Sequence, residues 1–350
     1  MKQYAFLLAC ISLLGTRCSD TASTDANSID QSNGRATTSK EITVVFYNIE
    51  NLFDTENDPD ILDDDFTSEG KYAWTAERLQ LHLEHSAQVL SAIDDDQPEL
   101  VGLCEIENKK VLEQLASTGG LASARYGFVH KDSPDERGID VALLFDEEIF
   151  SLIKTEFLLV TLPNHEDPNT RDVLYAELKS SGEKFHVFVN HWPSRRQGQQ
   201  ESEANRIAAA EIVKSKVDDI LLNDAKAKIL LMGDFNDYPE NKSISEVLDA
   251  GTTNESTLFN LMAEKQKSED GSYWYQGEWG WLDQMMVSQA FIDVENGWSV
   301  ARNSAFAFRE DFMMFTDAKG NKRPSRVYAG DDFKGGYSDH LPVFITLTRH

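Results

Sequence analysis

Lys228-Ile-Leu-Leu-Met232 runs directly into Gly233-Asp-Phe-Asn-Asp237, and this stretch decides the fold. The apolar run is too short for a helix, so it predicts a strand buried on both faces. Gly233 predicts a turn at which the backbone comes close to a neighbour. Asp234 and Asn236 are two residues apart, so in extended geometry their side chains project to the same side. Taken alone, the pair is either a set of oxygen ligands or a strand-end turn, and the turn is the commoner case.

The composition describes an acidic, well-packed globular protein. The 350 residues include 60 acidic and 33 basic side chains, a formal net charge of −27, and 41% are hydrophobic. A field of that sign repels polyanions and attracts divalent cations. Cys104 is the only cysteine after position 18, which excludes a disulfide framework and a cysteine-based zinc site in the body of the chain. We expect Cys104 to be a small buried residue.

The N-terminus has the pattern of a signal peptide over residues 1–18, with an apolar core too short to span a bilayer. The segment ending at Cys18 resembles a loose bacterial lipobox and predicts a lipid-modified cysteine. Arg17 departs from the usual small residue, so plain secretory cleavage is the alternative. Residues 19–40, rich in Ser, Thr, Asp and Asn, predict a flexible tether. The expected location is extracytoplasmic: lipid-anchored at the outer membrane or cell surface, in the periplasm, or else secreted.

Residues 41–350 predict one mixed α/β domain. Apolar spacing predicts helices over about 75–93, 109–118 and 201–222. Short apolar runs predict strands over 42–47, 100–104, 126–130, 141–145, 157–162, 173–178, 185–189, 228–232 and 341–348. Because the strands alternate with both helices and hairpin-like returns, we expect more than one sheet. The acidic loop at 54–65 fits a solvated charge run better than a calcium loop, because its spacing does not match an EF-hand.

Polar residues of the types used in catalysis follow several predicted strands. Five strands end in such residues, and a sixth apolar run contains one: Asn48, Glu105, His191, Asp234 with Asn236, Asp339 with His340, and Asp283. So many strand endings are hard to explain as turns, because strand ends converge at one edge of a layered α/β domain. The oxygen-rich set favours Mg²⁺, with Mn²⁺ and Ca²⁺ as alternatives, over zinc. A hard cation with a base that orients water is the equipment of phosphoester hydrolysis.

Ordered motifs along almost the whole domain resemble those of the endonuclease/exonuclease/phosphatase superfamily, in a bacterial secreted or lipoprotein branch. The motifs are Tyr47–Asn51, Cys104–Asn108, Arg137–Asp140, Asn190–Ser194, Gly233–Asp237, Leu282–Gln284 and Tyr337–His340. The superfamily includes pancreatic-type deoxyribonucleases, inositol polyphosphate 5-phosphatases and bacterial sphingomyelinases. The resemblance implies a four-layer α/β/β/α sandwich, in which two mixed β-sheets pack face to face with helices outside. It also implies Mg²⁺-dependent cleavage of a phosphoester by in-line water attack.

The resemblance also implies a role for each motif residue. The implied metal ligands are Glu105, Asn48 and Asp339. Asp234 would orient or deprotonate the water, and Asn236 would hold a phosphate oxygen. Asp283 would bond one nitrogen of His340 and fix its tautomer. His191 would act on the phosphate or on the leaving group. Arg137 would be either a bidentate phosphate clamp or an ordinary surface arginine.

The substrate is expected to be a phosphoester in a nucleic acid, a nucleotide, or a lipid or sugar phosphate. No continuous basic stripe suits duplex DNA, which favours a small metal-bound phosphoester. The aromatic stretch 273–281 either stacks a base, lipid or sugar group, or closes the edge of the core. We expect an endonuclease-like phosphodiesterase; the alternatives are a sphingomyelinase- or inositol-phosphatase-like hydrolase and a non-catalytic surface-binding lipoprotein. No obligate protein partner is inferred.

Overall fold

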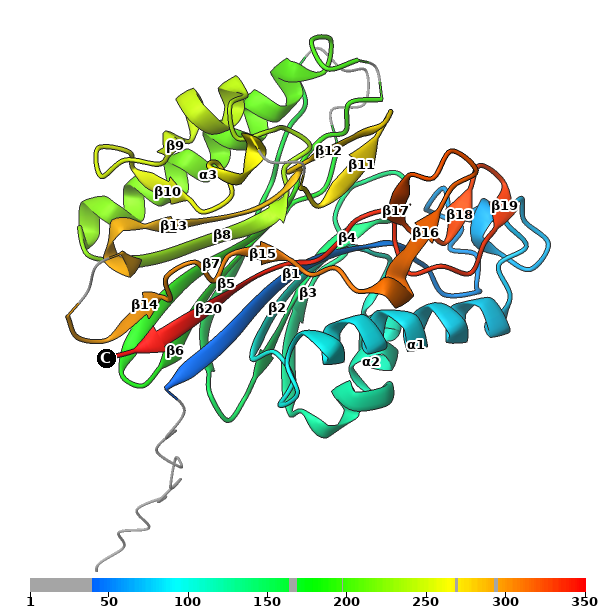
Figure 1. Ribbon diagram of the computed structural model, residues 1–350, viewed down its shortest axis with the longest axis horizontal. Coiled ribbons are helices and arrows are strands. Elements are labelled where there is room, and N and C mark those ends of the chain that lie inside the picture. Colours follow the sequence, from blue (N-terminus) through cyan, green and yellow to red (C-terminus); the bar gives the residue numbers. More distant parts are fainter. Residues whose placement is uncertain (1–39, 164–168, 197, 268–269, 293–294) are drawn as a thin grey trace, which may run out of the picture. The chain divides into compact units, whose positions relative to one another are not determined.

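Two mixed β-sheets form the body of the domain in the computed structural model, which describes residues 40–163, 169–196, 198–267, 270–292 and 295–350 (Figure 1). The first sheet has the order β14 (Trp298–Val300), β20 (Val343–Arg349), β1 (Glu41–Leu52), β2 (Leu100–Ile106), β4 (Asp140–Asp146) and β3 (Tyr126–His130), with β15 (Phe306–Ala307) paired to β20. The second has the order β5 (Ser151–Leu158), β6 (Val173–Ser180), β7 (Glu183–His191), β8 (Lys228–Asp234), β13 (Asp283–Ser288), β10 (Leu258–Asn260) and β9 (Ala250–Gly251).

Helices cover the outer face of each sheet. α1 (Ala76–Ile93) and α2 (Lys109–Ala116) pack against the first sheet, and α3 (Glu203–Asn223) packs against the second (Figure 1). The central apolar core lies between the two sheets. The predicted four-layer α/β/β/α sandwich is therefore confirmed.

Strand periodicity explains the layers. In β8, Leu230 and Met232 belong to the core between the sheets, whereas Ile229 and Leu231 belong to the core beneath α3. Successive side chains of a strand point to opposite faces, so an unbroken apolar run fills both layers at once. The 228–232 run is buried on both faces, as predicted. Cys104 is also fully buried.

The helix starts follow from capping side chains. Thr75 Oγ1 accepts a hydrogen bond from the Arg78 backbone at 3.4 Å, and Asn108 Oδ1 accepts one from Val111 at 3.1 Å. Each cap satisfies a backbone N–H that has no partner within the helix. These contacts place the first turns of α1 and α2 within a residue of the predicted positions.

Two sequence interpretations are corrected by the fold. The strand predicted over 157–162 is β5, Ser151–Leu158, an edge strand whose first five residues are exposed and include only two apolar residues, Leu152 and Ile153. The acidic loop at 54–65 is only partly solvated, because Asp54 is 5% and Asp63 is 1% exposed. Asp54 contributes its backbone N–H to the Glu107 carboxylate. The loop therefore packs against the first sheet.

Shorter elements complete the described chain. Three two-stranded ribbons are β11 (Tyr273–Tyr275) with β12 (Glu278–Gly280), β16 (Met314–Thr316) with β17 (Lys322–Pro324), and β18 (Tyr328–Ala329) with β19 (Asp332–Phe333). Single turns of 3₁₀ or π-helix occur at Asp64–Phe66, Gly119–Ser123, Ser243–Val247, Lys265–Lys267, Gln289–Phe291 and Asp311–Met313. Among the described residues, no helix is long and apolar enough to cross a membrane. The predicted signal peptide at 1–18, and the predicted tether except residue 40, lie outside the described residues.

Gly233 marks a close approach between two strands. A Cβ atom at this position would lie 2.5 Å from the backbone oxygen of Asn190 on β7, which leaves room only for glycine. The parallel register of β7 and β8 pairs Asn190 with Gly233 and therefore His191 with Asp234. The close approach predicted from the sequence thus sets two expected site residues opposite each other.

Candidate active site

The strand register gathers the polar strand endings at one edge of the two sheets. Antiparallel pairing places Asp283, the first residue of β13, opposite Asp234 at the end of β8. In the first sheet, Asn48 of β1 lies opposite Cys104 of β2, and Glu105 follows directly. Asn48 Nδ2 donates to Asp234 Oδ2 at 3.2 Å, which joins the two sheets at this edge.

Asp234 lies at the centre of the cluster. Its Oδ2 is 3.8 Å from Nε2 of His191 and 3.8 Å from Nε2 of His340, and its Oδ1 accepts the Asn236 backbone N–H at 2.9 Å. The residue is only 2% exposed. Burial raises the pKa of Asp234 to about 6, with His340 opposing the shift and Asp283 adding to it. The Asp234 carboxylate is thus mainly ionised at neutral pH. Its pKa is close enough to neutral pH for the group to accept and release a proton.

His340 is held by Asp283. His340 Nδ1 donates to Asp283 Oδ2 at 2.7 Å, which is the contact expected from the sequence. Burial alone would lower the pKa of His340, but the charges of Asp283 and Asp234 raise it well above its usual value. Because Nδ1 is engaged by Asp283, Nε2 is the nitrogen that faces Asp234. The ring of Tyr273 lies 4.6 Å from the His340 ring, centroid to centroid, and flanks it.

The pKa of His191 is shifted in the opposite direction from that of His340. Its Nε2 is 3.8 Å from Glu105 Oε1 and 3.8 Å from Asp234 Oδ2. Burial lowers the pKa of His191 well below its usual value, and the nearby charges of Arg171, Arg137 and His340 lower it further. The site therefore combines a cationic and a neutral imidazole beside one carboxylate.

Glu105 is suited to hold a cation. Its backbone has φ +64°, a left-handed conformation that turns the side chain out of the strand pattern, and its Oε2 accepts the Asn51 N–H at 2.9 Å. Burial raises the pKa of Glu105, and the charge of Asp339 raises it further. Two partly buried carboxylates that repel each other fit a bound cation.

A second donor set lies within the cluster. Single donor atoms of Asp234, Asp283 and His340 lie within 4.8 Å of one another, close enough to share an ion. This set differs from the expected ligands Glu105, Asn48 and Asp339. An ion on His340 Nδ1 would have to replace its short hydrogen bond to Asp283, whereas an ion on Nε2, which lies 3.8 Å from Asp234 Oδ2, would leave that bond intact. The cluster thus offers two candidate donor sets for a divalent ion, one around Glu105 and one around Asp234.

Asp339 is engaged by a residue that the sequence reading missed. Arg326 Nη2 forms an ion pair with Asp339 Oδ2, and Arg326 Nε lies 3.5 Å from Glu50 Oε1. Glu50 is buried, accepts the Val327 N–H at 2.8 Å and has a pKa that burial raises well above its usual value. Any metal contact by Asp339 would use its remaining oxygen. Glu50 lies within a quoted motif, whereas nothing in the sequence around Arg326 marks it.

Asn236 is tied to the backbone. It has φ +50°, is 9% exposed, and donates from Nδ2 to the Trp192 backbone oxygen at 3.0 Å. Only its second amide hydrogen could serve the expected phosphate contact. Asp237 is buried and forms an ion pair with Arg206 at 2.8 Å, away from the cluster.

Arginines gather beside His191. Arg137, Arg171 and Arg196 line a cavity of about 270 Å³, and the charges of all three act on His191. Arg171, which the sequence reading missed, is 5% exposed and donates to Asp135 Oδ2 at 3.0 Å and to the Trp192 oxygen at 2.8 Å. Arg171 and Asp172 precede a strand, so a search of strand starts as well as strand ends would have found it. Arg137 is 29% exposed at its side chain and reaches Asp135 only at 3.6 Å, so its guanidinium, like that of the exposed Arg196, is available to an anion.

The aromatic stretch 273–281 divides between two roles. Trp281 is fully buried in the core between the sheets, as expected if the stretch closes the edge of the core. Tyr273 flanks His340, and Tyr275 is 58% exposed next to it in the same ribbon. Tyr273 therefore borders the site, and Trp281 belongs to the core.

Residues 43–349 match the family model described as "Endonuclease/Exonuclease/phosphatase family". The chain belongs to this family. Its members are phosphoester hydrolases, so the cluster around Asp234 lies in a domain of that chemistry. A search of curated proteins found no match.

Solved structures of this family share the fold. A family protein from Bacteroides thetaiotaomicron has a TM-score of 0.56 at 15% identity, covering 89% of this chain and 95% of that one. Humanized D. rerio TDP2 has a TM-score of 0.55 at 14% identity, covering 89% and 100%. A mannosyl-6-phosphatase from B. thetaiotaomicron has a TM-score of 0.55 at 16% identity, covering 88% and 99%. At these identities the similarity establishes the fold alone.

The two histidines are expected to differ in protonation in the metal-free protein. At neutral pH His340 should be an imidazolium and His191 a neutral imidazole, because Asp283 raises the pKa of the first and burial lowers that of the second. Asp283→Asn should lower the pKa of His340. The measurement is an NMR titration of the ring protons. A raised pKa contributes stability that is present below the unfolded value of 6.5 and is lost as the pH rises through the folded value.

His82 provides the control signal for this titration. It is buried in the core beneath α1, and burial lowers its pKa to about 4. Its titration should not change in Asp283→Asn. A wild-type His340 that titrates below 6.5, or one that Asp283→Asn leaves unchanged, would contradict the assigned pairing.

Proposed function

We propose that this protein is a divalent-metal-dependent phosphoester hydrolase of the endonuclease-like phosphodiesterase type, with its catalytic centre at Asp234. The observation that carries the proposal is the position of this buried carboxylate, 3.8 Å from the Nε2 atoms of both His191 and His340 and hydrogen-bonded to Asn48. A carboxylate with a pKa of about 6 is matched to accepting a proton from water near neutral pH. A surface-binding protein has no need for such an arrangement.

The surrounding residues have distinct roles in this proposal. Asp234 orients the attacking water and accepts its proton, while Asn48 holds the carboxylate in place. His340, kept cationic by Asp283, donates from Nε2 to a phosphate oxygen as negative charge builds up. His191 is neutral, so it can donate one hydrogen bond to the phosphate or to the leaving oxygen. Asn236 would add its second amide hydrogen.

Glu105 is the proposed principal ligand of Mg²⁺, with Mn²⁺ or Ca²⁺ as alternatives, and Asn48 and Asp339 lie at or near the ion. When bound, the ion would neutralise charge on the phosphate. Glu105 and Asp339 are the carboxylates whose mutual repulsion such an ion would relieve. In a protein with a net charge of −27, this local compensation is what allows an anionic substrate to approach.

Hydrolysis should depend on Asp234, Glu105 and a divalent ion. We expect Asp234→Asn to lower kcat by about 10²–10⁴-fold, the usual contribution of a positioned proton acceptor. Glu105→Ala and EDTA should abolish turnover. The measurement is hydrolysis of bis-p-nitrophenyl phosphate, plasmid DNA, RNA, sphingomyelin and inositol phosphates with Mg²⁺ or Mn²⁺. Asp219→Asn, an exposed substitution on α3, is the matched control and should leave kcat unchanged.

The enzyme proposal would be overturned if no substrate showed turnover sensitive to EDTA and the wild type matched Glu105→Ala. Nicking of plasmid DNA without cleavage of lipid or inositol phosphates would support the phosphodiesterase of nuclease type. Cleavage of sphingomyelin or inositol phosphates alone would support the alternative, a lipid- or sugar-phosphate hydrolase.

The arginine-lined cavity favours the alternative function, a lipid- or sugar-phosphate hydrolase, in one respect. Its basic side chains are confined to about 270 Å³ beside His191 and do not form a stripe, which suits a compact anionic group better than a long polymer. Arg137 is the proposed phosphate clamp, because its guanidinium is partly exposed and weakly engaged. Arg171 is a positioning residue that holds Asp135 and the backbone at Trp192.

Loss of Arg137 should weaken substrate binding. A hydrogen bond to a charged group contributes about 1.5–3 kcal/mol, so Arg137→Ala should lower kcat/KM by roughly 10–100-fold, mainly through KM. Arg137→Lys should recover only part of this, because lysine lacks the planar fork. Arg125→Ala, at a mainly exposed arginine, is the control. An unchanged kcat/KM in Arg137→Ala would remove this residue from the site.

Lipid anchoring outside the cytoplasm is also proposed, on the support of the leader pattern at residues 1–18 and of Cys18. In bacterial cells, the full chain should fractionate with membranes and Cys18→Ser should release it. The measurement is fractionation together with mass spectrometry of the mature N-terminus. An unmodified N-terminus in a wild-type protein that is already soluble would establish plain secretion in place of anchoring.

A further inference from the structure

Three side chains with metal-binding donors meet outside the catalytic cluster, at the two ends of the loop from β3 to β4. His130 ends β3, Asp140 begins β4, and Asp132 lies just inside the loop. In the β3–β4 register His130 pairs with Ala142, so Asp140 lies diagonally across from it on the same face of the sheet. Donor atoms of the three residues lie within 4.8 Å of one another.

This group lies on the other face of the first sheet from the catalytic centre. Ala142 and Leu144 of β4 belong to the core beneath α1 and α2, and Asp140 continues that outward-facing series. Val44 and Phe46 of β1 belong to the core between the sheets, and Asn48 continues the inward-facing series. The alternation of a strand therefore separates the two sites.

Two buried polar atoms in the group have no partner. His130 Nε2 and Asp140 Oδ2 are buried at side chains that are each 2% exposed, and neither has a hydrogen-bond partner among the described residues. They lie 3.8 Å apart, too far for a hydrogen bond. Two ligands that each lie about 2.1 Å from one ion are themselves roughly 3–4 Å apart. The spacing therefore fits two atoms that share a cation.

Among the described residues, the charge of the Asp140 carboxylate has no fixed cationic partner. Its only ion-pair contact in the part of the chain that the structure describes is the 3.8 Å approach to His130. Lys131, next to His130 in sequence, pairs instead with Asp172 at 2.9 Å. A buried carboxylate that lacks a cationic side chain fits a bound ion.

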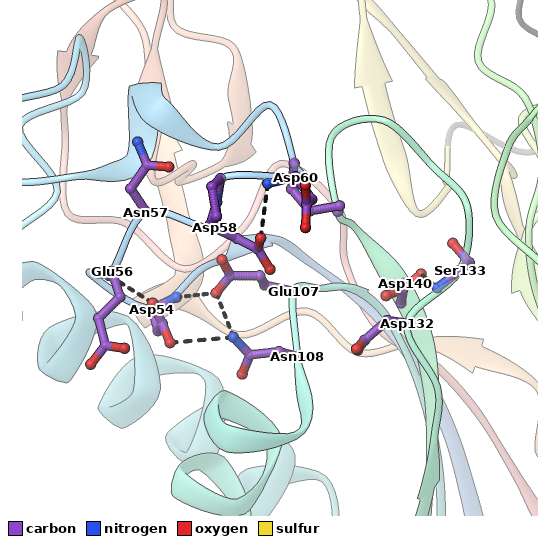
Figure 2. Close-up of a pocket in the computed structure, with 13 residues that line it drawn as sticks. Asp54, Glu56, Asn57, Asp58, Asp60, Glu107, Asn108, Asp132, Ser133 and Asp140 are labelled. Carbon is purple, nitrogen blue, oxygen red and sulfur yellow. Dashed lines mark hydrogen bonds between the residues drawn. The ribbon is translucent and has the colours of Figure 1, made fainter.

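A cavity of about 440 Å³ gives access to the group (Figure 2). Figure 2 shows Asp132 and Asp140 on one side of this cavity and Asp54, Glu107 and Asn108 on the other. The Asp132 side chain is 80% exposed, so an ion can reach the buried pair from solvent. Waters in the cavity can complete its coordination.

We propose that His130, Asp132 and Asp140 bind a divalent transition-metal ion in a site separate from the catalytic centre. An imidazole with two carboxylates suits Zn²⁺ or Mn²⁺ better than Mg²⁺ or Ca²⁺, which take oxygen ligands. Asp140 Oδ1 accepts the Ser133 N–H at 3.0 Å, an outer contact that orients the carboxylate.

The ion would join the two ends of the loop that carries Arg137. Asp135, which contacts both Arg171 and Arg137, lies within residues 131–139, as does Arg137 itself. Fixing the ends of this loop limits the positions open to Arg137. The ion thus has a structural role. Its effect on substrate binding rests on the proposed function, whereas the binding of the ion does not.

The test is the number of ions bound by the full chain after removal of metals. Equilibrium dialysis against Zn²⁺, and separately Mn²⁺, should give one ion fewer for Asp140→Asn than for the wild type, whereas Glu105→Gln should retain this ion. Zn²⁺ should also raise the Tm of the wild type and of Glu105→Gln but raise that of Asp140→Asn less. Neither readout uses turnover, so the result stands apart from the proposed hydrolysis.

Asp132→Asn is the second variant, because an exposed carboxylate can be replaced without loss of folding. It should weaken binding of this ion by more than about tenfold, since even loss of an outer contact costs a metal site 10–100-fold. Equal ion counts and affinities for the wild type, Asp132→Asn and Asp140→Asn would overturn the proposal. That result would identify His130 and Asp140 as a buried pair without an ion.

Discussion

The negative charge of Asp234, held where little water reaches it, is the constraint on which the site depends. A buried carboxylate is costly unless hydrogen bonds and positive charge surround it. Asn48 from the facing sheet, the backbone of Asn236 and the cationic His340 provide them. Each of these groups comes from a different strand ending. The two sheets must therefore pack in one register for the charge to be tolerated, and the site and the sandwich are specified together.

Four of the ten described non-glycine residues with positive φ lie at the same edge. Glu50, Asn51, Glu105 and Asn236 all have φ between +50° and +64°, a region that costs residues other than glycine of order 1–3 kcal/mol each. Strands that continued in regular geometry would alternate these side chains between the two faces. At Glu105 the left-handed conformation turns the side chain toward the cluster instead, where it lies 3.8 Å from His191. The apolar cores on both sides of each sheet supply the stability that keeps these conformations in place.

The family and the sandwich could be predicted from sequence because both depend on local patterns. Unbroken apolar runs such as 228–232 identify strands that are buried on both faces, and polar residues directly after them identify the functional edge. The β5 strand was misplaced because an exposed edge strand has no such pattern. Arg171 and Arg326 were missed for a related reason: an arginine in a loop looks the same in sequence whether it faces water or a buried carboxylate. No motif surrounds His130 in the sequence, so its position beside Asp140 follows only from the structure.

The sequence by itself determined the candidate residues for phosphoester chemistry and their place at the ends of strands of an α/β domain, since residue type and period are local properties. Only the tertiary structure decided the partners of those residues. Asp339 meets Arg326, Asn236 is bound to the Trp192 backbone, and Asp140 meets His130 on the outer face of the first sheet. These pairings join positions far apart in the chain or set by strand register. The physical reason is that a contact depends on how strands align and sheets pack, which no single segment encodes.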